Sequence, residues 1–266
     1  MKVLFYTNCV NWSIRYYLSR HYSNIKYEEI PNYQFLDNSM PLNEQKEKWK
    51  LLDWPDVFIY QKIDNKYGDK SSDSILEKLP KDCVKISIPY PYNNVNWILF
   101  PPAVGDGEVG EWGDTTKYSN SESIIKYKRM GYSLKQILDL YRNGMMDFDI
   151  PGRVERYYNE LTERDKILDV KMSDFIQEHA RTHQLFFTQN HLTSILAGHL
   201  SNQIFEVLGT SYRDNPLGHP LIVTHIHGGS YTHSIYDQKY WNFQFPAKYS
   251  ADVFIPVIKT IYETYN

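Results

Sequence analysis

The sequence predicts an α/β protein with a doubly wound, mostly parallel sheet in three layers and a helical insertion. Short apolar runs alternate with amphipathic stretches over residues 2–89, which is typical of strands joined by crossover helices. The same alternation returns near residue 173, after a block with helical spacing of its apolar residues. We therefore expect one α/β domain over 1–266, with a mainly helical insertion at about 115–170.

The first part of the chain contains most of the expected sheet. Near-continuous apolar runs favour strands that are buried on both faces, as parallel strands are. We expect strands at 2–7, 26–30, 56–61 and 84–89, and helices at 10–22, 42–52 and 73–79. Parallel folds of this kind bind ligands at the carboxyl ends of their strands. Asn8, Cys9 and Gln61 fall at such ends.

Glycines and acidic residues alternate over 105–114, which predicts a solvated loop, with a lid that closes on substrate as the alternative. Its acids exclude a phosphate-binding loop. Helix signals follow it: two capping boxes, a glycine suited to a helix end and an apolar helix face. They lie at Ser119-x-x-Glu122, Ser133-x-x-Gln136, Gly144 and 154–168.

The sheet pattern resumes with a helix at 173–182 and a strand at 184–188. A long helix with an apolar face then runs to Gly209, and Asn190 is a residue type that caps helix N-termini. This pattern predicts that His191 lies in the first turn of that helix. His191 would then share the edge of the sheet with Cys9.

Cys9 lies between an expected strand and an expected helix, where the helix dipole lowers the pKa of a thiol and favours a nucleophilic thiolate. His191 is the residue type that serves as its base. The alternatives are structural: a free cysteine is often a small buried hydrophobe, and a histidine near a helix start is often a surface residue.

Composition excludes several classes of protein. The net charge of −3 and the lack of a Lys/Arg cluster argue against nucleic-acid binding. No apolar run reaches the ~20 residues of a membrane span, and the N-terminal apolar run is too short for a secretory signal, so we expect a cytoplasmic protein. Two cysteines cannot form a disulfide framework or a four-cysteine zinc site. Aromatic residues, at 15%, suit both cores and stacking on sugars or nucleobases.

A second group of histidines consists of His219, His225, His227 and His233. His225 and His227 would share one face of a strand, a spacing that metal sites use. No cysteine or acidic residue lies between His219 and His233. We therefore expect a ligand-contacting or surface role, and no metal.

Six segments carry a resemblance to a known family: 5–9, 56–61, 86–89, 131–133, 164–176 and 185–191. In this order, from about Val3 to Gly209, they resemble the WcbI-type capsular polysaccharide biosynthesis proteins. The resemblance implies an SGNH-hydrolase-like fold, coenzyme A binding and acetyl transfer to a polysaccharide. The chain departs from the family pattern at Thr7, Val10 and Leu192, where the family has Gly, Gln and Pro. Thr188 stands at the Asp position of the SGNH Asp-x-x-His motif.

The sequence and the resemblance together predict a CoA-binding acyltransferase that moves an acetyl group from acetyl-CoA to a sugar hydroxyl of a surface polysaccharide. Asn8 and nearby backbone amides would face the developing oxyanion, and Gln61 would add a polar contact. His191, beside Asn190, would take the hydroxyl proton. Cys9 would be acylated or would line the thioester pocket. Cationic candidates for the CoA phosphates are Lys126, Lys128, Arg129, Arg153, Arg156 and Arg164.

Two other classes of function remain open at this point. An SGNH-type esterase or hydrolase would use the same site with water as the acceptor. A non-catalytic carbohydrate-binding protein would account for the tyrosines and tryptophans alone. CoA binding separates the transferase from the hydrolase, and loss of turnover on substitution of Cys9 or His191 separates an enzyme from a binding protein.

Overall fold

The computed structural model of the protein describes residues 1–99, 121–210, 212–213, 215–218 and 232–265. The chain divides into two compact units. The first comprises Met1–Pro91, Leu161–Gln177 and His191–His225, and the second comprises Tyr92–Glu160, Glu178–Asn190 and Ile226–Asn266. The single domain over 1–266, with an insertion at about 115–170, stays a prediction.

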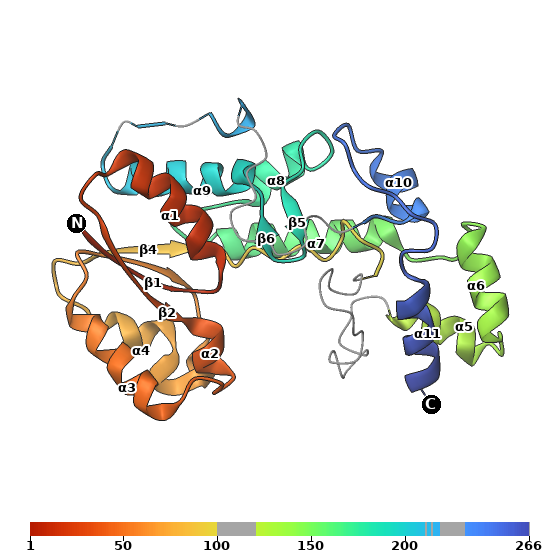
Figure 1. Cartoon of the computed structure of the whole chain (residues 1–266), viewed down its shortest axis with the longest axis horizontal. Helices are drawn as coiled ribbons and strands as arrows, with labels where there is room; N and C mark the ends of the chain where they lie inside the picture. Colours follow the sequence, from red (N-terminus) through yellow and green to blue (C-terminus); the bar gives the residue numbers. More distant parts are fainter. Residues whose placement is uncertain (100–120, 211, 214, 219–231, 266) are drawn as a thin grey trace. The chain divides into compact units, whose positions relative to one another are not determined.

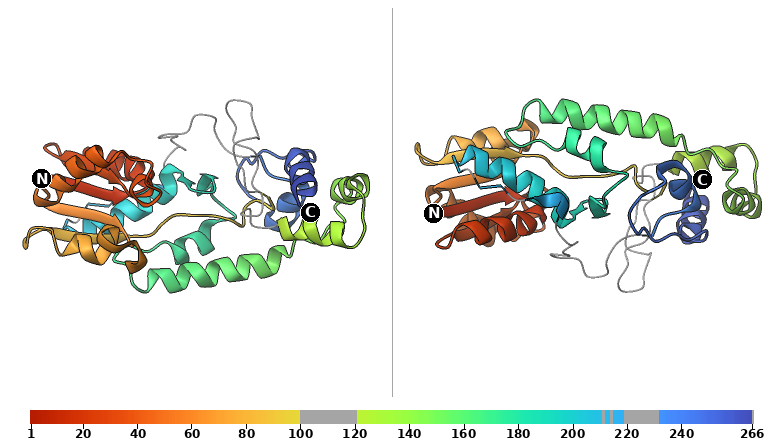
Figure 2. Two further views of the ribbon diagram at one scale, coloured as in Figure 1. Left: turned by 90° about the horizontal axis from the view of Figure 1, so that it is seen from below. Right: turned by 90° about the horizontal axis from the view of Figure 1, so that it is seen from above.

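The first unit contains a four-stranded parallel sheet in the order β2-β1-β3-β4 (Figure 1). Its strands also run side by side in both views of Figure 2. The strands are β1 (Lys2–Thr7), β2 (Lys26–Pro31), β3 (Val57–Gln61) and β4 (Val84–Ile88). The register places Tyr6 beside Ile30 and Tyr60. All four expected strands are confirmed to within a residue, and so is the α/β class.

Helices cover both faces of this sheet (Figure 1). One face carries α1 (Val10–His21) and α9 (Ser194–Val207), which pack against each other. The other face carries α2, α3 and α4, at Asn32–Leu36, Leu42–Trp49 and Ser72–Leu76, with 3-10 turns at Lys50–Asp53 and Asn65–Lys70. This arrangement gives the three layers of a doubly wound fold.

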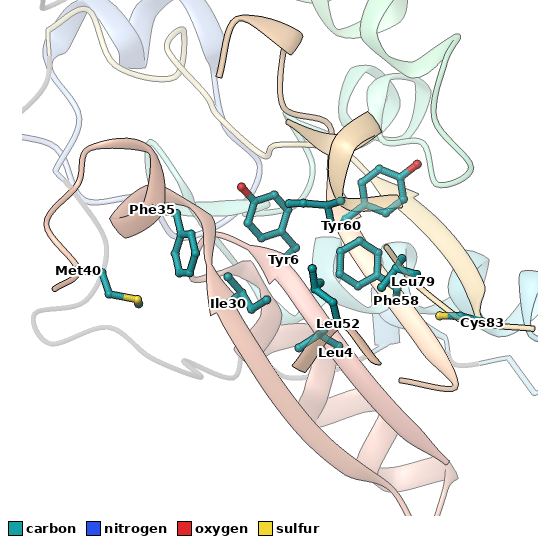
Figure 3. Close-up of a cluster of buried hydrophobic side chains, with 11 residues drawn as sticks. Leu4, Tyr6, Ile30, Phe35, Met40, Leu52, Phe58, Tyr60, Leu79 and Cys83 are labelled. Carbon is teal, nitrogen blue, oxygen red and sulfur yellow. The ribbon is translucent and has the colours of Figure 1, made fainter. Parts of the chain in front are cut away.

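The core between the sheet and α2–α4 consists of residues from alternate strand positions, because successive strand side chains point to opposite faces. Leu4 and Tyr6 of β1 and Phe58 and Tyr60 of β3 all point into it (Figure 3). Phe35 of α2 joins them with its side chain fully buried. Burial of these apolar groups is the main force that fixes the sheet on its helices.

The strand order creates a crevice at one edge of the sheet. The chain leaves β1 into α1 on one face and leaves β3 toward α4 on the other. Neighbouring strands that lead to opposite faces leave space between the two connections, and ligands of open α/β sheets bind there. The residues at this point are Asn8, Cys9 and Gln61, as the sequence predicts.

The second unit is mainly helical. Its elements are α5 (Ser121–Arg129), α6 (Leu134–Arg142), β5 (Phe186–Thr188), α10 (Ile235–Trp241) and α11 (Ile255–Thr264). Helices α7 (Ile150–Asp165) and α8 (Ser173–His179) contribute residues to both units. Among the described residues, no helix combines the length and apolar character that a membrane span needs.

Two of the expected helix signals in the second unit are confirmed. Ser133 and Gln136 form a reciprocal capping box at the start of α6. Gly144 follows the end of this helix with φ +68°, a conformation that glycine adopts without strain. The expected loop at 105–114 and the capping box that begins at Ser119 lie outside the described residues.

The predicted start of α9 is wrong by one turn. His191 and Leu192 form the short strand β6, Thr193 is the N-cap, and the helix begins at Ser194. Asn190 does not cap it; its Oδ1 instead accepts a hydrogen bond from Thr188 Oγ1 at 3.4 Å. Asn and Thr are both N-cap residue types, so local preference could not choose between them. Leu192 is buried, and it lies in the extended backbone of β6 and not in the helix.

Candidate functional site

Gln61 connects the carboxyl ends of all four strands. Its Oε1 accepts from Asn8 N at 2.9 Å and from Asn32 Nδ2 at 3.0 Å. Its Nε2 donates to Asn8 Oδ1 at 3.0 Å and to Pro89 O at 3.3 Å. Asn8, Asn32 and Pro89 are the residues that follow β1, β2 and β4. Because Gln61 is only 1% exposed, water cannot replace these bonds, and the network fixes this edge of the sheet.

Asn8 shapes the turn that carries Cys9. Its Oδ1 accepts from Val10 N at 3.2 Å, so it satisfies one of the amides that a helix start leaves unpaired. Its carbonyl accepts from Thr7 Oγ1 at 2.9 Å and from Asn11 Nδ2 at 3.2 Å. Cys9 is consequently held as the N-cap residue of α1, with φ −58° and ψ −7° and a half-buried side chain.

The electrostatics of Cys9 differ from the expectation. Burial raises the pKa of its thiol, and the opposing effect of its own backbone amide is smaller. Desolvation disfavours the charged thiolate, and here it outweighs the hydrogen bond from the backbone. Cys9 is therefore a neutral thiol near pH 7, rather than a thiolate stabilised by the helix dipole.

We expect iodoacetamide to label Cys9 slowly near pH 7 and faster as the pH rises past the usual thiol value of about 8.5, because only the thiolate reacts. Cys83 is 7% exposed, so it should label more slowly than Cys9. Mass spectrometry of the two cysteine peptides measures both rates, and Cys83→Ser and Cys9→Ser variants assign them. Rapid labelling of Cys9 near pH 6 would contradict the raised pKa.

A cavity of about 1050 Å³ opens beside Gln61 within the first unit. Tyr33 and Tyr90 line it, and the ionised form of Cys9, present at high pH, raises the pKa of both tyrosines, so Cys9 lies close to the cavity. Burial, and then the Cys9 charge, raise the pKa of Tyr90; the side chain of Asn8 and the charge of Arg164 oppose this. Arg164 also lines the cavity and is thus the CoA-phosphate candidate that the structure places at this site.

Asn32, Tyr33 and Tyr90 are site residues that the sequence pattern did not single out. Asn32 and Tyr33 directly follow β2, and Tyr90 comes two residues after β4. The rule that identified Asn8 and Gln61 applies to the ends of these strands as well. The position of these residues after expected strands could have identified them, but a single tyrosine is not distinctive in a chain with 23 tyrosines.

The other cationic candidates belong to the second unit. Lys128 donates to the carbonyls of Tyr262 and Tyr265, and Arg129 donates to the Tyr265 hydroxyl. Arg153 is 9% exposed and donates to Asn94 O. Arg156 pairs with Asp149 at 2.9 Å, and Lys126 is exposed. Four of these five side chains thus already hold parts of their own unit together.

His191 belongs to the same unit as Cys9, whereas Asn190 belongs to the second. The strand β6 that contains His191 lies against α1, the helix that Cys9 begins, and against α9. His191 is half-buried. The strand that contains His191, the proposed base, thus packs against the helix that follows Cys9, the proposed nucleophile.

The described member of the second histidine group is His233, which is buried in the second unit. Its Nδ1 lies 3.0 Å from Asn96 O, and its ring stacks on Trp97. Burial lowers its pKa to about 4, so it is a neutral packing residue. His219, His225 and His227 lie outside the described residues. Within the described part of the chain, no group of three or more His, Cys, Asp or Glu could hold a metal ion.

Comparison with known proteins agrees with this fold. The family model of the polysaccharide biosynthesis enzyme WcbI matches residues 2–213. A solved structure of WcbI, described as a polysaccharide biosynthesis enzyme without a disulfide bond between CoA and one of its cysteines, shares the fold with a TM-score of 0.66. The two are 18% identical, and the match covers 100% of this chain and 90% of the other. No curated protein matches significantly. The match over 2–213 shows that this chain belongs to the WcbI family of polysaccharide biosynthesis enzymes.

Proposed function

We propose that the protein transfers an acetyl group from acetyl-CoA to a sugar hydroxyl in the biosynthesis of a capsular or other surface polysaccharide. The observation that carries this proposal is the position of Cys9, held beside a cavity at the crevice of a WcbI-family α/β fold. The solved WcbI structure supports it, because its description mentions a disulfide bond between CoA and a cysteine, which that native structure lacks. The proposed donor agrees with a cytoplasmic location.

The residues around Cys9 have defined roles in this proposal. The side-chain Nδ2 of Asn8 and the backbone N–H of Cys9 would donate to the developing oxyanion. Asn8 N and Val10 N are not available for this, because they donate to Gln61 Oε1 and to Asn8 Oδ1. Gln61 holds Asn8 in place through two hydrogen bonds. His191, in the segment after Asn190, takes the proton from the sugar hydroxyl.

Two routes lead to the same product. In the first, the Cys9 sulfur attacks the thioester carbonyl and the CoA thiol leaves; the sugar oxygen then attacks the acyl-enzyme and Cys9 leaves. The exchange of one thioester for another is nearly isoenergetic, which favours this route. In the second, Cys9 lines the thioester pocket and the sugar oxygen attacks acetyl-CoA directly. The first route requires that a base take the Cys9 proton, because burial raises its pKa.

The CoA phosphates require cations. Arg164 is the candidate in the unit that contains Cys9. Lys126, Lys128, Arg129, Arg153 and Arg156 are the candidates in the second unit. Arg guanidinium groups suit this role, because they bind phosphate with two parallel hydrogen bonds.

We expect CoA and acetyl-CoA to raise the melting temperature, because a ligand that binds only the folded state stabilises it by mass action. The affinity should fall as salt rises, since phosphate contacts are screened. Differential scanning fluorimetry and calorimetry measure both effects, with pantetheine as a control that lacks the nucleotide phosphates. Bound CoA should also protect Cys9 from iodoacetamide. If saturating CoA gives no melting shift and no binding heat while ester substrates are hydrolysed, the protein is a hydrolase and the proposal fails.

A further inference from the structure

We infer that the cavity beside Gln61 is the site of the sugar acceptor, and that it selects a neutral or basic sugar over an acidic one. This inference rests on the proposed function and adds to it the location and charge preference of the acceptor. The cavity, at about 1050 Å³, is slightly larger than the roughly 300–1,000 Å³ of small-molecule sites, so it has room for more than one sugar ring.

Exposed aromatic rings surround the cavity. Tyr33, Tyr67 and Tyr90 all line it, with exposed fractions of 48%, 40% and 43%. Exposed apolar rings that gather around one cavity often mark a ligand-binding groove. A tyrosine offers an apolar face and a hydrogen-bonding tip, which match the apolar face and hydroxyl groups of a sugar ring.

Fixed carboxylates supply hydrogen-bond acceptors in the same cavity. Asp64 Oδ1 accepts from Lys66 N at 2.8 Å, and Asp73 Oδ2 accepts from Asn65 Nδ2 at 2.9 Å. In each carboxylate, one oxygen thus holds the side chain in place through its hydrogen bond, and the other can accept a hydrogen bond from a hydroxyl group of the ligand. Such acceptors suit a polyhydroxyl compound, since every sugar hydroxyl is a donor.

The charges of the cavity lining disfavour an acidic sugar. Three carboxylates, those of Asp37, Asp64 and Asp73, accompany two cations, Lys62 and Arg164. Hydrogen bonds from Ser39 lower the pKa of Asp37, so it is ionised at neutral pH. This net negative lining would repel the carboxylate of a uronic acid, whereas it would not repel a neutral sugar and would attract an amino sugar.

The cavity also lies close to Cys9, the residue proposed to take part in acyl transfer. Gln61 lines it and hydrogen-bonds Asn8, the residue before Cys9. Tyr33 and Tyr90 lie close enough to Cys9 for its charge to raise their pKa values. A hydroxyl group of a sugar bound between these tyrosines would therefore lie near the acyl group.

The test is a binding panel on the full chain. Saturation-transfer NMR and calorimetry measure methyl glycosides of glucose, galactose and mannose, their uronic acid counterparts and glucosamine. We expect at least one neutral glycoside or glucosamine to bind, and each uronic acid to bind roughly threefold or more weakly than its neutral counterpart, as for exposed like charges. The double variant Asp64→Asn/Asp73→Asn should reduce this difference, because it removes the charges and keeps the positioning acceptors.

The variant Tyr67→Ala should weaken binding of the glycoside by about fivefold through loss of stacking, while CoA binding stays unchanged. Tyr16→Ala and Asp82→Asn are matched controls, because neither residue lines the cavity. Equal binding of neutral and acidic sugars, or a loss of CoA affinity in Tyr67→Ala, overturns the inference. If CoA binds the wild type and no glycoside does, the inference fails while the proposed function stands; if CoA also fails to bind, the proposed function fails.

Discussion

Substitution of His191 with Ala is expected to lower turnover by about a hundredfold or more, the effect of losing a general base. Turnover is measured as CoA release from acetyl-CoA in the presence of the glycoside that binds best. Cys9→Ala distinguishes the two routes. If Cys9 is acylated, Cys9→Ala and Cys9→Ala/His191→Ala should each lose about as much as His191→Ala, because the pair acts as one unit.

If Cys9 only lines the pocket, Cys9→Ala should mainly raise the Michaelis constant for acetyl-CoA, and its effect should add to that of His191→Ala. Ser13→Ala, a small substitution elsewhere on α1, controls for disturbance of the helix. Melting curves of each variant identify any loss that is due to unfolding. Near-normal turnover in His191→Ala would contradict the role of His191 as the base.

Replacement of Gln61 with Ala is expected to lower the free energy of unfolding by about 3 kcal/mol or more, because it leaves several buried donors and acceptors unpaired. Asn8 N, Asn32 Nδ2 and Pro89 O lose this partner, and Asn8 Oδ1 keeps only the bond from Val10 N. Urea denaturation measures the loss. Turnover should fall as well, since Asn8 would no longer be held beside Cys9.

The matched control is Gln45→Ala, which removes another buried glutamine. Gln45 Nε2 donates to Met40 O at 2.7 Å, in a helix away from the strand ends. Its loss should cost about 1 kcal/mol, the usual value for one hydrogen bond, and should leave turnover unchanged. A Gln61→Ala variant as stable as Gln45→Ala would mean that the strand ends do not depend on Gln61.

Much of the fold could be predicted from the sequence, because local pattern decides it. A buried parallel strand needs an apolar run, and the runs at β1, β3 and β4 have no competing interpretation. The start of α9 could not be predicted, since Asn190 and Thr193 have similar capping ability. The burial of Leu192, a tertiary contact, decided between them.

The candidate site, too, was predictable from the sequence only in part. The sequence by itself determined which residues stand at the ends of β1 and β3, because strand boundaries are local and parallel strands end at one edge. Only the tertiary structure decided that Gln61 bonds to the ends of the other three strands, and that Tyr33, Tyr67 and Tyr90 line one cavity. It also decided that the pKa of Cys9 is raised. Solvation of a thiol depends on every segment packed around it, and no local pattern contains that information.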